Sequence, residues 1–135
     1  MAEIKIYNPP ELAQPVGPYS HVAVAGNAKM IYIAGQVGVD KDGKLVGEGD
    51  FQKQCAQVFA NLETALKSAG AGWANVVQCI SYIVDAKYIP ALYEYRLGAF
   101  PKMFPGGNYP PNTLLVVNRL VNEKYLVEIQ AIAAV

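Results

Sequence analysis

Two polar side chains interrupt apolar runs near the C-terminal end of the sequence, and both are of types that can take part in chemistry. Glu128 lies between Val127 and Ile129, and Asn112 opens the apolar run 113–117. A carboxylate in such a run is either hydrated at the rim of a sheet or held in a cleft, where it can act as an acid or base. Both readings of Glu128 are open at this point, and these two positions define the functional question.

Other reactive side chains give weaker signals. The single histidine, His21, follows a Gly-Pro turn and is interpreted as a turn residue. Cys55 and Cys79 fit no metal-binding spacing, so we expect buried free thiols and no metal site. Four of the nine tyrosines gather around one segment and are either packing material or the wall of an aromatic pocket: Tyr88, Tyr93, Tyr95 and Tyr109.

Composition predicts one compact domain over residues 1–135. Apolar residues make up 53% of the chain and charged residues 16%, with a formal net charge of zero. Because no Lys/Arg stripe forms, we expect no nucleic acid partner. The N-terminus lacks the apolar core of a signal peptide, and no apolar run is long enough to span a bilayer. We therefore expect a soluble, cytoplasmic protein with no membrane partner.

Periodicity predicts an α+β domain. Asp50 is a helix N-cap candidate, and Gly70 ends the apolar stripe that begins at Phe51. Gly26-Asn27 predicts a tight turn of a hairpin, and the polar turn 121–124 joins the two closing strands. Pro101 is expected to break the second helix. The predicted strands are 3–7, 21–25, 30–37, 76–84, 113–117 and 126–135, and the predicted helices are 51–69 and 88–100.

This element order indicates a mixed sheet with two helices packed on one face. The closing strands are apolar on both faces, so both faces need a cover, and two helices cover only one. A second copy of the chain is the economical cover for the other face. We therefore expect a homo-oligomer, with any small-molecule pocket at the place where subunits meet.

Several segments resemble the reactive intermediate deaminase (Rid, YjgF-type) family, from about Ala13 to Val135: QPVGPYS, IYIAGQVGVD, QCAQVF, GAGWANVVQCISYIVD, YPPNT and VEIQAIA. The resemblance implies a chorismate-mutase-like fold and a homotrimer with three clefts between subunits. It also implies hydrolysis of enamines and imines to a 2-oxo acid and ammonia, without a metal or cofactor.

Three positions match the family's cleft. Glu128 corresponds to its strand glutamate, thought to position or activate water, which favours the cleft reading of this carboxylate. Tyr19 corresponds to its glycine-turn tyrosine. Gly35 corresponds to the glycine of its Ser-Gly pair, although Ala34 replaces the serine. By resemblance, Glu128 and Tyr19 are the catalytic candidates, and Ala34 and Gly35 line the substrate site.

Three other positions depart from the family and alter the expected ligand. Asn112 stands where the family's arginine grips the substrate carboxylate, Leu114 replaces a neighbouring cysteine, and Tyr93 replaces an asparagine of the second helix. An asparagine offers a neutral amide where arginine offers a planar charged fork. We judge that Arg119 lies too far along the strand, at the opposite parity, to replace that arginine. Arg96 or Lys102 reaching in from a neighbouring segment remains open.

Three functions follow. The first is a Rid-fold trimer with altered specificity for a neutral or weakly charged small molecule, an imine or enamine, with Glu128 acting on water. The second is an ordinary 2-imino acid deaminase in which another cation replaces the arginine. The third is a ligand-binding or chaperone-like protein without turnover. An RNase activity attached to some relatives gains little support from the neutral charge.

Overall fold

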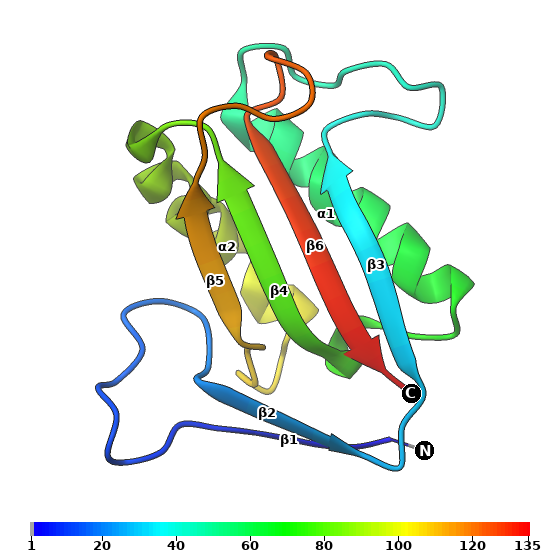
Figure 1. Ribbon diagram of the computed structural model, residues 1–135, viewed down its shortest axis with the longest axis vertical. Coiled ribbons are helices and arrows are strands. Elements are labelled where there is room, and N and C mark those ends of the chain that lie inside the picture. Colours follow the sequence, from blue (N-terminus) through cyan, green and yellow to red (C-terminus); the bar gives the residue numbers. More distant parts are fainter. Residues whose placement is uncertain (1) are drawn as a thin grey trace.

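The computed structural model describes residues 2–135, and a four-stranded mixed sheet forms its centre (Figure 1). In chain order the elements are β1 (Glu3–Tyr7), β2 (Val22–Gly26), β3 (Met30–Val37), α1 (Phe51–Ser68), β4 (Val76–Ile83), α2 (Ile89–Met103), β5 (Asn112–Val116) and β6 (Val127–Ala134). The sheet order is β3-β6-β4-β5, with β4 and β5 parallel and the other neighbours antiparallel. Both helices lie behind one face of the sheet, which confirms the predicted α+β class.

Helix α1 is bounded by the local signals that predicted it. The Asp50 side chain accepts a hydrogen bond from the Lys53 amide at 3.0 Å, which satisfies a free N–H of the first turn. At the other end Gly70 adopts φ +74°, and the Ala71 amide donates to the Leu66 carbonyl. The apolar stripe between them is buried against the sheet. Within residues 2–135, neither helix is long and apolar enough to cross a membrane.

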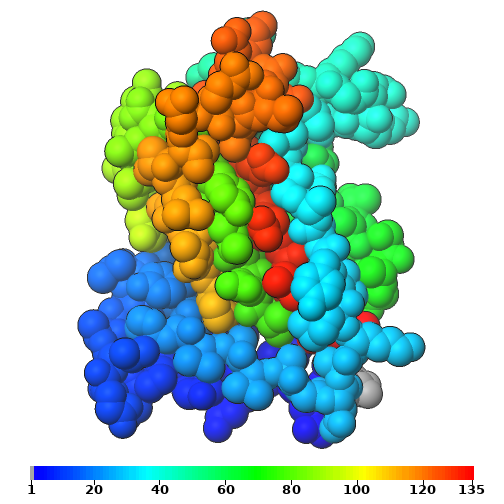
Figure 2. Space-filling view, in the orientation of Figure 1, coloured from blue at the N-terminus to red at the C-terminus, as the bar shows by residue number. Residues whose placement is uncertain are grey.

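Strand β6 is the central strand of the core. Its alternate residues Val127, Ile129, Ala131 and Ala133 are buried on the helix side. The residues between them, which include Glu128, point to the other face. Figure 2 shows that face: β6 and β4 are visible between the edge strands, and no other segment covers them.

The predicted hairpin of residues 21–25 with 30–37 is wrong. Gly26 and Asn27 do turn the chain, and Asn27 has φ 49°. However, β2 pairs antiparallel with β1 in a separate two-stranded sheet, while β3 pairs with β6. The reason is that β6 needs a neighbour on each side, and β3 packs two isoleucines against the core when it takes that place.

The two closing strands are not neighbours either, although a short polar segment joins them. Strand β4 lies between β5 and β6, and the connection 117–126 passes over the end of β4 (Figure 1). Helix α2 also runs past Pro101 to Met103, where we expected a break. The proline lies in the last turn, where it removes one helical hydrogen bond, and the helix still closes because the Phe104 amide donates to the Phe100 carbonyl.

Gln54 is a buried polar side chain that ties α1 to the start of β6. Its amide nitrogen donates to the carbonyls of Gly47 and Lys124, both at 3.1 Å. Its oxygen accepts from the Leu126 amide at 2.8 Å. Because Leu126 is two residues before Glu128, these bonds help to fix the position of the carboxylate.

We expect Gln54→Met to destabilise the protein by about 2–3 kcal/mol, because the change keeps the volume but leaves buried backbone groups without partners. Urea unfolding followed by circular dichroism measures this. Lys53→Met is the matched control, since Lys53 is exposed on the same turn and should change stability by less than about 0.5 kcal/mol. Equal stability of the two variants would contradict the role given to Gln54.

Candidate functional site

The Glu128 carboxylate lies directly over the backbone of Gly35. A Cβ built on Gly35 would collide with Oε1 of Glu128 and lie 2.8 Å from its Cδ. The β3–β6 register shifts between Ile33 and Gln36, so Ala34 and Gly35 form a bulge beside the glutamate. A side chain at position 35 would therefore displace the Glu128 carboxylate. We name Ala34, Gly35 and Glu128 the glutamate half-site.

Glu128 also lines a hollow of about 350 Å³ on the open face of the sheet. Tyr82, Gln130 and Arg119 share this hollow, and the Tyr82 hydroxyl donates to Gln130 at 3.0 Å. The Arg119 guanidinium is held by the carbonyls of Leu120 and Val121. We expected no role for Arg119, because it lies too far along the strand from Asn112 and at the opposite parity. The loop after β5 instead brings Arg119 to the hollow that Glu128 also lines.

Asn112 lies on the opposite, helix-covered side of the sheet in a polar network. It pairs with Cys79 in the parallel β4–β5 ladder. Its side-chain oxygen accepts from the Ser81 hydroxyl at 2.8 Å and from Nη2 of Arg96 at 3.1 Å. Nη2 also donates to Ser81 at 2.7 Å. Arg96 therefore does reach Asn112, the position at which the resemblance implies an arginine in the family.

Sequence reasoning left Arg96 open and missed Ser81, although both have a signal. Leu92, Arg96 and Phe100 recur every four residues and are the buried residues of α2, so the arginine lies on the apolar stripe of its helix. Ser81 is the polar member of the buried, alternating positions of β4. Lys102, the other open alternative, is exposed on a different side of α2.

Arg96 is a buried cation without an acidic partner among the described residues. It is 2% exposed, and its Nε is the one buried side-chain polar atom of residues 2–135 that lacks a hydrogen bond. Burial lowers the pKa of Arg96, and its nearby ionisable neighbours that oppose this shift are Cys79, Tyr93 and Cys55. Burying such a charge is costly unless it is paired. This part of the protein therefore has an unbalanced positive charge.

The two cysteines are buried and free, as expected from their spacing. Burial raises the pKa of Cys55 to about 12 and that of Cys79 to about 11, while the charge of Arg96 opposes both shifts. Both thiols therefore stay protonated at neutral pH and supply no negative charge to balance Arg96. Within residues 2–135 no three His, Cys, Asp or Glu side chains cluster closely enough to hold a metal ion.

Tyr93 connects this network to the turn that carries Tyr19. The Tyr93 ring lies against Gly17, where an added Cβ would be 3.1 Å from its Cδ1. The Tyr19 amide donates to the Gly17 carbonyl at 2.8 Å. Leu114 is partly buried and packs against the core. We name Ser81, Arg96 and Asn112 the asparagine half-site; Tyr93 lies near Arg96, and Tyr19 belongs to the turn that Tyr93 contacts.

One chain does not bring the two half-sites together. The glutamate half-site lies at β3 and β6, whereas Asn112 lies on β5, the opposite edge of the sheet. Glu128 pairs with Tyr82 of β4 and Asn112 with Cys79, so two strand spacings and three residues separate them. These steps amount to roughly 10 Å across the sheet and roughly 10 Å along it, on opposite faces.

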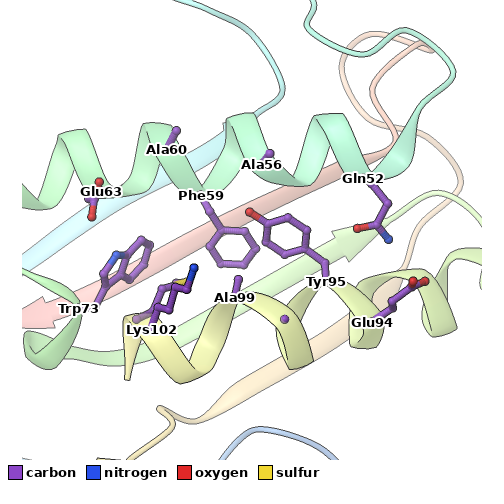
Figure 3. Close-up of a pocket in the computed structure, with 12 residues that line it drawn as sticks. Gln52, Ala56, Phe59, Ala60, Glu63, Trp73, Glu94, Tyr95, Ala99 and Lys102 are labelled. Atoms are coloured by element: carbon purple, nitrogen blue, oxygen red, sulfur yellow. The ribbon is translucent and has the colours of Figure 1, made fainter. Parts of the chain in front are cut away.

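A larger hollow of about 570 Å³ lies between α1 and α2 (Figure 3). The rings of Phe59 and Tyr95 stack in its middle with centroids 5.3 Å apart, and Trp73 and Lys102 lie at one end. Tyr95 and Lys102 line this hollow, but none of the positions matched to the family's cleft does. The candidate site therefore lies on the sheet, although the hollow between the helices is larger.

Known proteins share this chain's sequence and fold. A family model described as endoribonuclease L-PSP matches residues 10–135. A RutC family protein of Synechocystis is 32% identical over 131 residues, covering 96% of this chain and 95% of that protein. A Dermatophagoides farinae protein named 2-iminobutanoate/2-iminopropanoate deaminase is 28% identical over 105 residues, covering 78% and 80%. The crystal structure of YyfB, a Rid family protein from Yersinia pestis, matches at 31% identity with TM-score 0.86 over 98% of both chains.

We expect Gly35→Ala to push the Glu128 carboxylate out of place while the fold remains intact, because the flexible side chain can move aside. The variant should lose at least tenfold in activity or ligand affinity. Its melting temperature should remain within a few degrees of the wild type. Gly98→Ala is the control: nothing lies within 4 Å of an added Cβ there, and a helical alanine stabilises by about 0.5–1 kcal/mol. Unchanged activity of Gly35→Ala would contradict this geometry.

Proposed function

Since this chain belongs to the Rid family, whose model is described as endoribonuclease L-PSP, we propose that it is a hydrolase of small imines or enamines. Residues 1–135 form one domain, and copies of it assemble into a homotrimer with clefts between subunits. The observation that carries this proposal is the Glu128 carboxylate, which lies over Gly35 in an open hollow of the sheet. A relative named as an iminobutanoate deaminase supports the same reaction class.

The reaction is the addition of water to a C=N bond. Glu128 takes a proton from water as the oxygen bonds to the imine carbon, and it then gives this proton to the nitrogen, which yields a carbinolamine. Collapse of the carbinolamine forms the C=O bond, breaks the C–N bond and releases ammonia. The carboxylate serves first as base and then as acid, so its protonation state is restored after each cycle.

A second copy of the chain brings together the two half-sites, which lie apart within one chain. Ala34 and Gly35 lie on one edge strand of the sheet and Asn112 lies on the other, so a contact between the β3 edge of one copy and the β5 edge of the next would bring the two half-sites together. Such contacts are head-to-tail, and three of them close a ring. The open face offers apolar surface for this assembly, since Tyr32 is 74% and Leu115 is 43% exposed.

We expect Glu128→Gln to lower kcat/KM for an imine by about 10²- to 10⁴-fold, because the amide cannot take the proton from water. The imine can be generated from an amino acid by an amino-acid oxidase, with ammonia release measured above the spontaneous rate. Glu94→Gln is the control, since Glu94 is an exposed carboxylate outside both half-sites. Unchanged turnover in Glu128→Gln, or no turnover by the wild type, would refute the proposed reaction.

Light scattering should give a particle of three times the 14.6 kDa chain mass. Tyr32→Glu should dissociate it, because the change places a charge in the apolar contact between copies. Leu97→Glu is the matched control: Leu97 is 67% exposed but lies on α2, away from the open face. A monomeric wild type, or dissociation by the Leu97 variant alone, would overturn the proposed assembly.

A further inference from the structure

The unbalanced charge of Arg96 is the feature of this molecule that the proposed reaction does not yet use. The ion pairs among residues 2–135 join Lys67 to Glu63 and Lys124 to Glu48, and neither involves Arg96. The guanidinium instead lies under the sheet at 2% exposure, with Nε unpartnered. A buried charge without a counter-ion suits a site in which a ligand supplies the opposite charge.

The hydrogen bonds of Arg96 and Ser81 fix the orientation of the Asn112 side-chain amide. A guanidinium only donates, so the atom of Asn112 that faces Arg96 must be its oxygen. The Ser81 hydroxyl accepts from Arg96 and therefore gives its own hydrogen to the same oxygen. With two donors on Oδ1, the Asn112 amide cannot flip, and its Nδ2 donors face away from Arg96. The positive end of the fixed Asn112 amide dipole therefore points away from the buried arginine.

We propose that Arg96 is a positioning residue that acts through Asn112 and makes the cleft select ligands bearing a carboxylate. This inference rests on the proposed function for one point, which is that Asn112 faces a cleft between copies. Nδ2 of Asn112 donates to a carboxylate oxygen, and the charge behind it attracts the anion. One buried cation matches a monoanion, so a single carboxylate is the group that this site selects.

This arrangement makes an unusual demand on position 112. An arginine introduced there would place a second guanidinium beside Arg96, whose Nη2 lies 3.1 Å from the Asn112 side chain. Two like charges at this distance repel each other. Asn112→Arg alone should therefore lower the melting temperature of the ligand-free protein. The same change combined with Arg96→Met should restore it, because the charge then simply moves from α2 to β5.

The test measures binding of two probes to the full assembled protein by isothermal titration calorimetry. The probes are 2-oxobutanoate and its neutral amide, 2-oxobutanamide, which differ in the carboxylate alone. We expect the wild type to bind the carboxylate at least tenfold more tightly, with inorganic phosphate failing to compete. Arg96→Met should lower this ratio to near one, and adding Asn112→Arg should bring it back. Lys102→Gln, which removes an exposed cation from the same helix, should leave the ratio unchanged.

The ratio separates this role from a merely structural one, since loss of fold would weaken both probes together. Melting temperatures add a second check: Arg96→Met should be as stable as the wild type or more so, because a buried unpaired charge is removed. A retained ratio in Arg96→Met, no preference or no binding in the wild type, or no recovery in the double variant would overturn the proposal. If the protein does not hydrolyse imines but still prefers the carboxylate probe in an Arg96-dependent way, the proposed reaction is refuted and the role of Arg96 stands.

Discussion

The alternation of β6 is the constraint on which the rest of the molecule depends. Four small or branched apolar residues of this strand must face the helices, because they form the centre of the core. A strand repeats every two residues, so the same requirement turns Glu128 to the other face. A shift of register by one residue would bury the carboxylate and expose the core. The position of the candidate base is thus fixed by the packing of its neighbours, and Gln54 anchors the start of the same strand.

Local signals were enough to predict the elements. Asp50 and Gly70 mark the two ends of α1, and each can be recognised from a few neighbouring residues. Likewise, polar and apolar side chains alternate within the five residues Glu3–Tyr7. Strand partners were harder to predict, since the turn at Gly26-Asn27 fits a hairpin equally well. What decides the pairing is the need of β6 for a neighbour on each side, which is a property of the whole sheet.

In the candidate site, too, some residues could be predicted from local motifs, whereas others depend on the packing of the whole fold. Gly35 and Glu128 were identified from motifs, and the β3–β6 pairing brings them together. The contact of Arg96 with Asn112 depends on how α2 is rotated over the sheet. Six residues on a helix turn by about 240°, so Arg96 and Lys102 face different sides, and only the packed helix reveals which of them points to β5. The apolar stripe of α2 held that information, but a charged residue in a stripe is easily assigned to the surface.

Because Glu128 and Asn112 are separated within one chain, the activity of the protein depends on its concentration. In the assembly that we propose, a lone chain folds, keeps its core and its glutamate, and still has no complete cleft. Complete clefts appear only as copies associate, so their number follows the law of mass action and not simply the amount of folded protein. Dilution would then silence the protein without unfolding it, and raising its concentration would restore activity more steeply than in proportion.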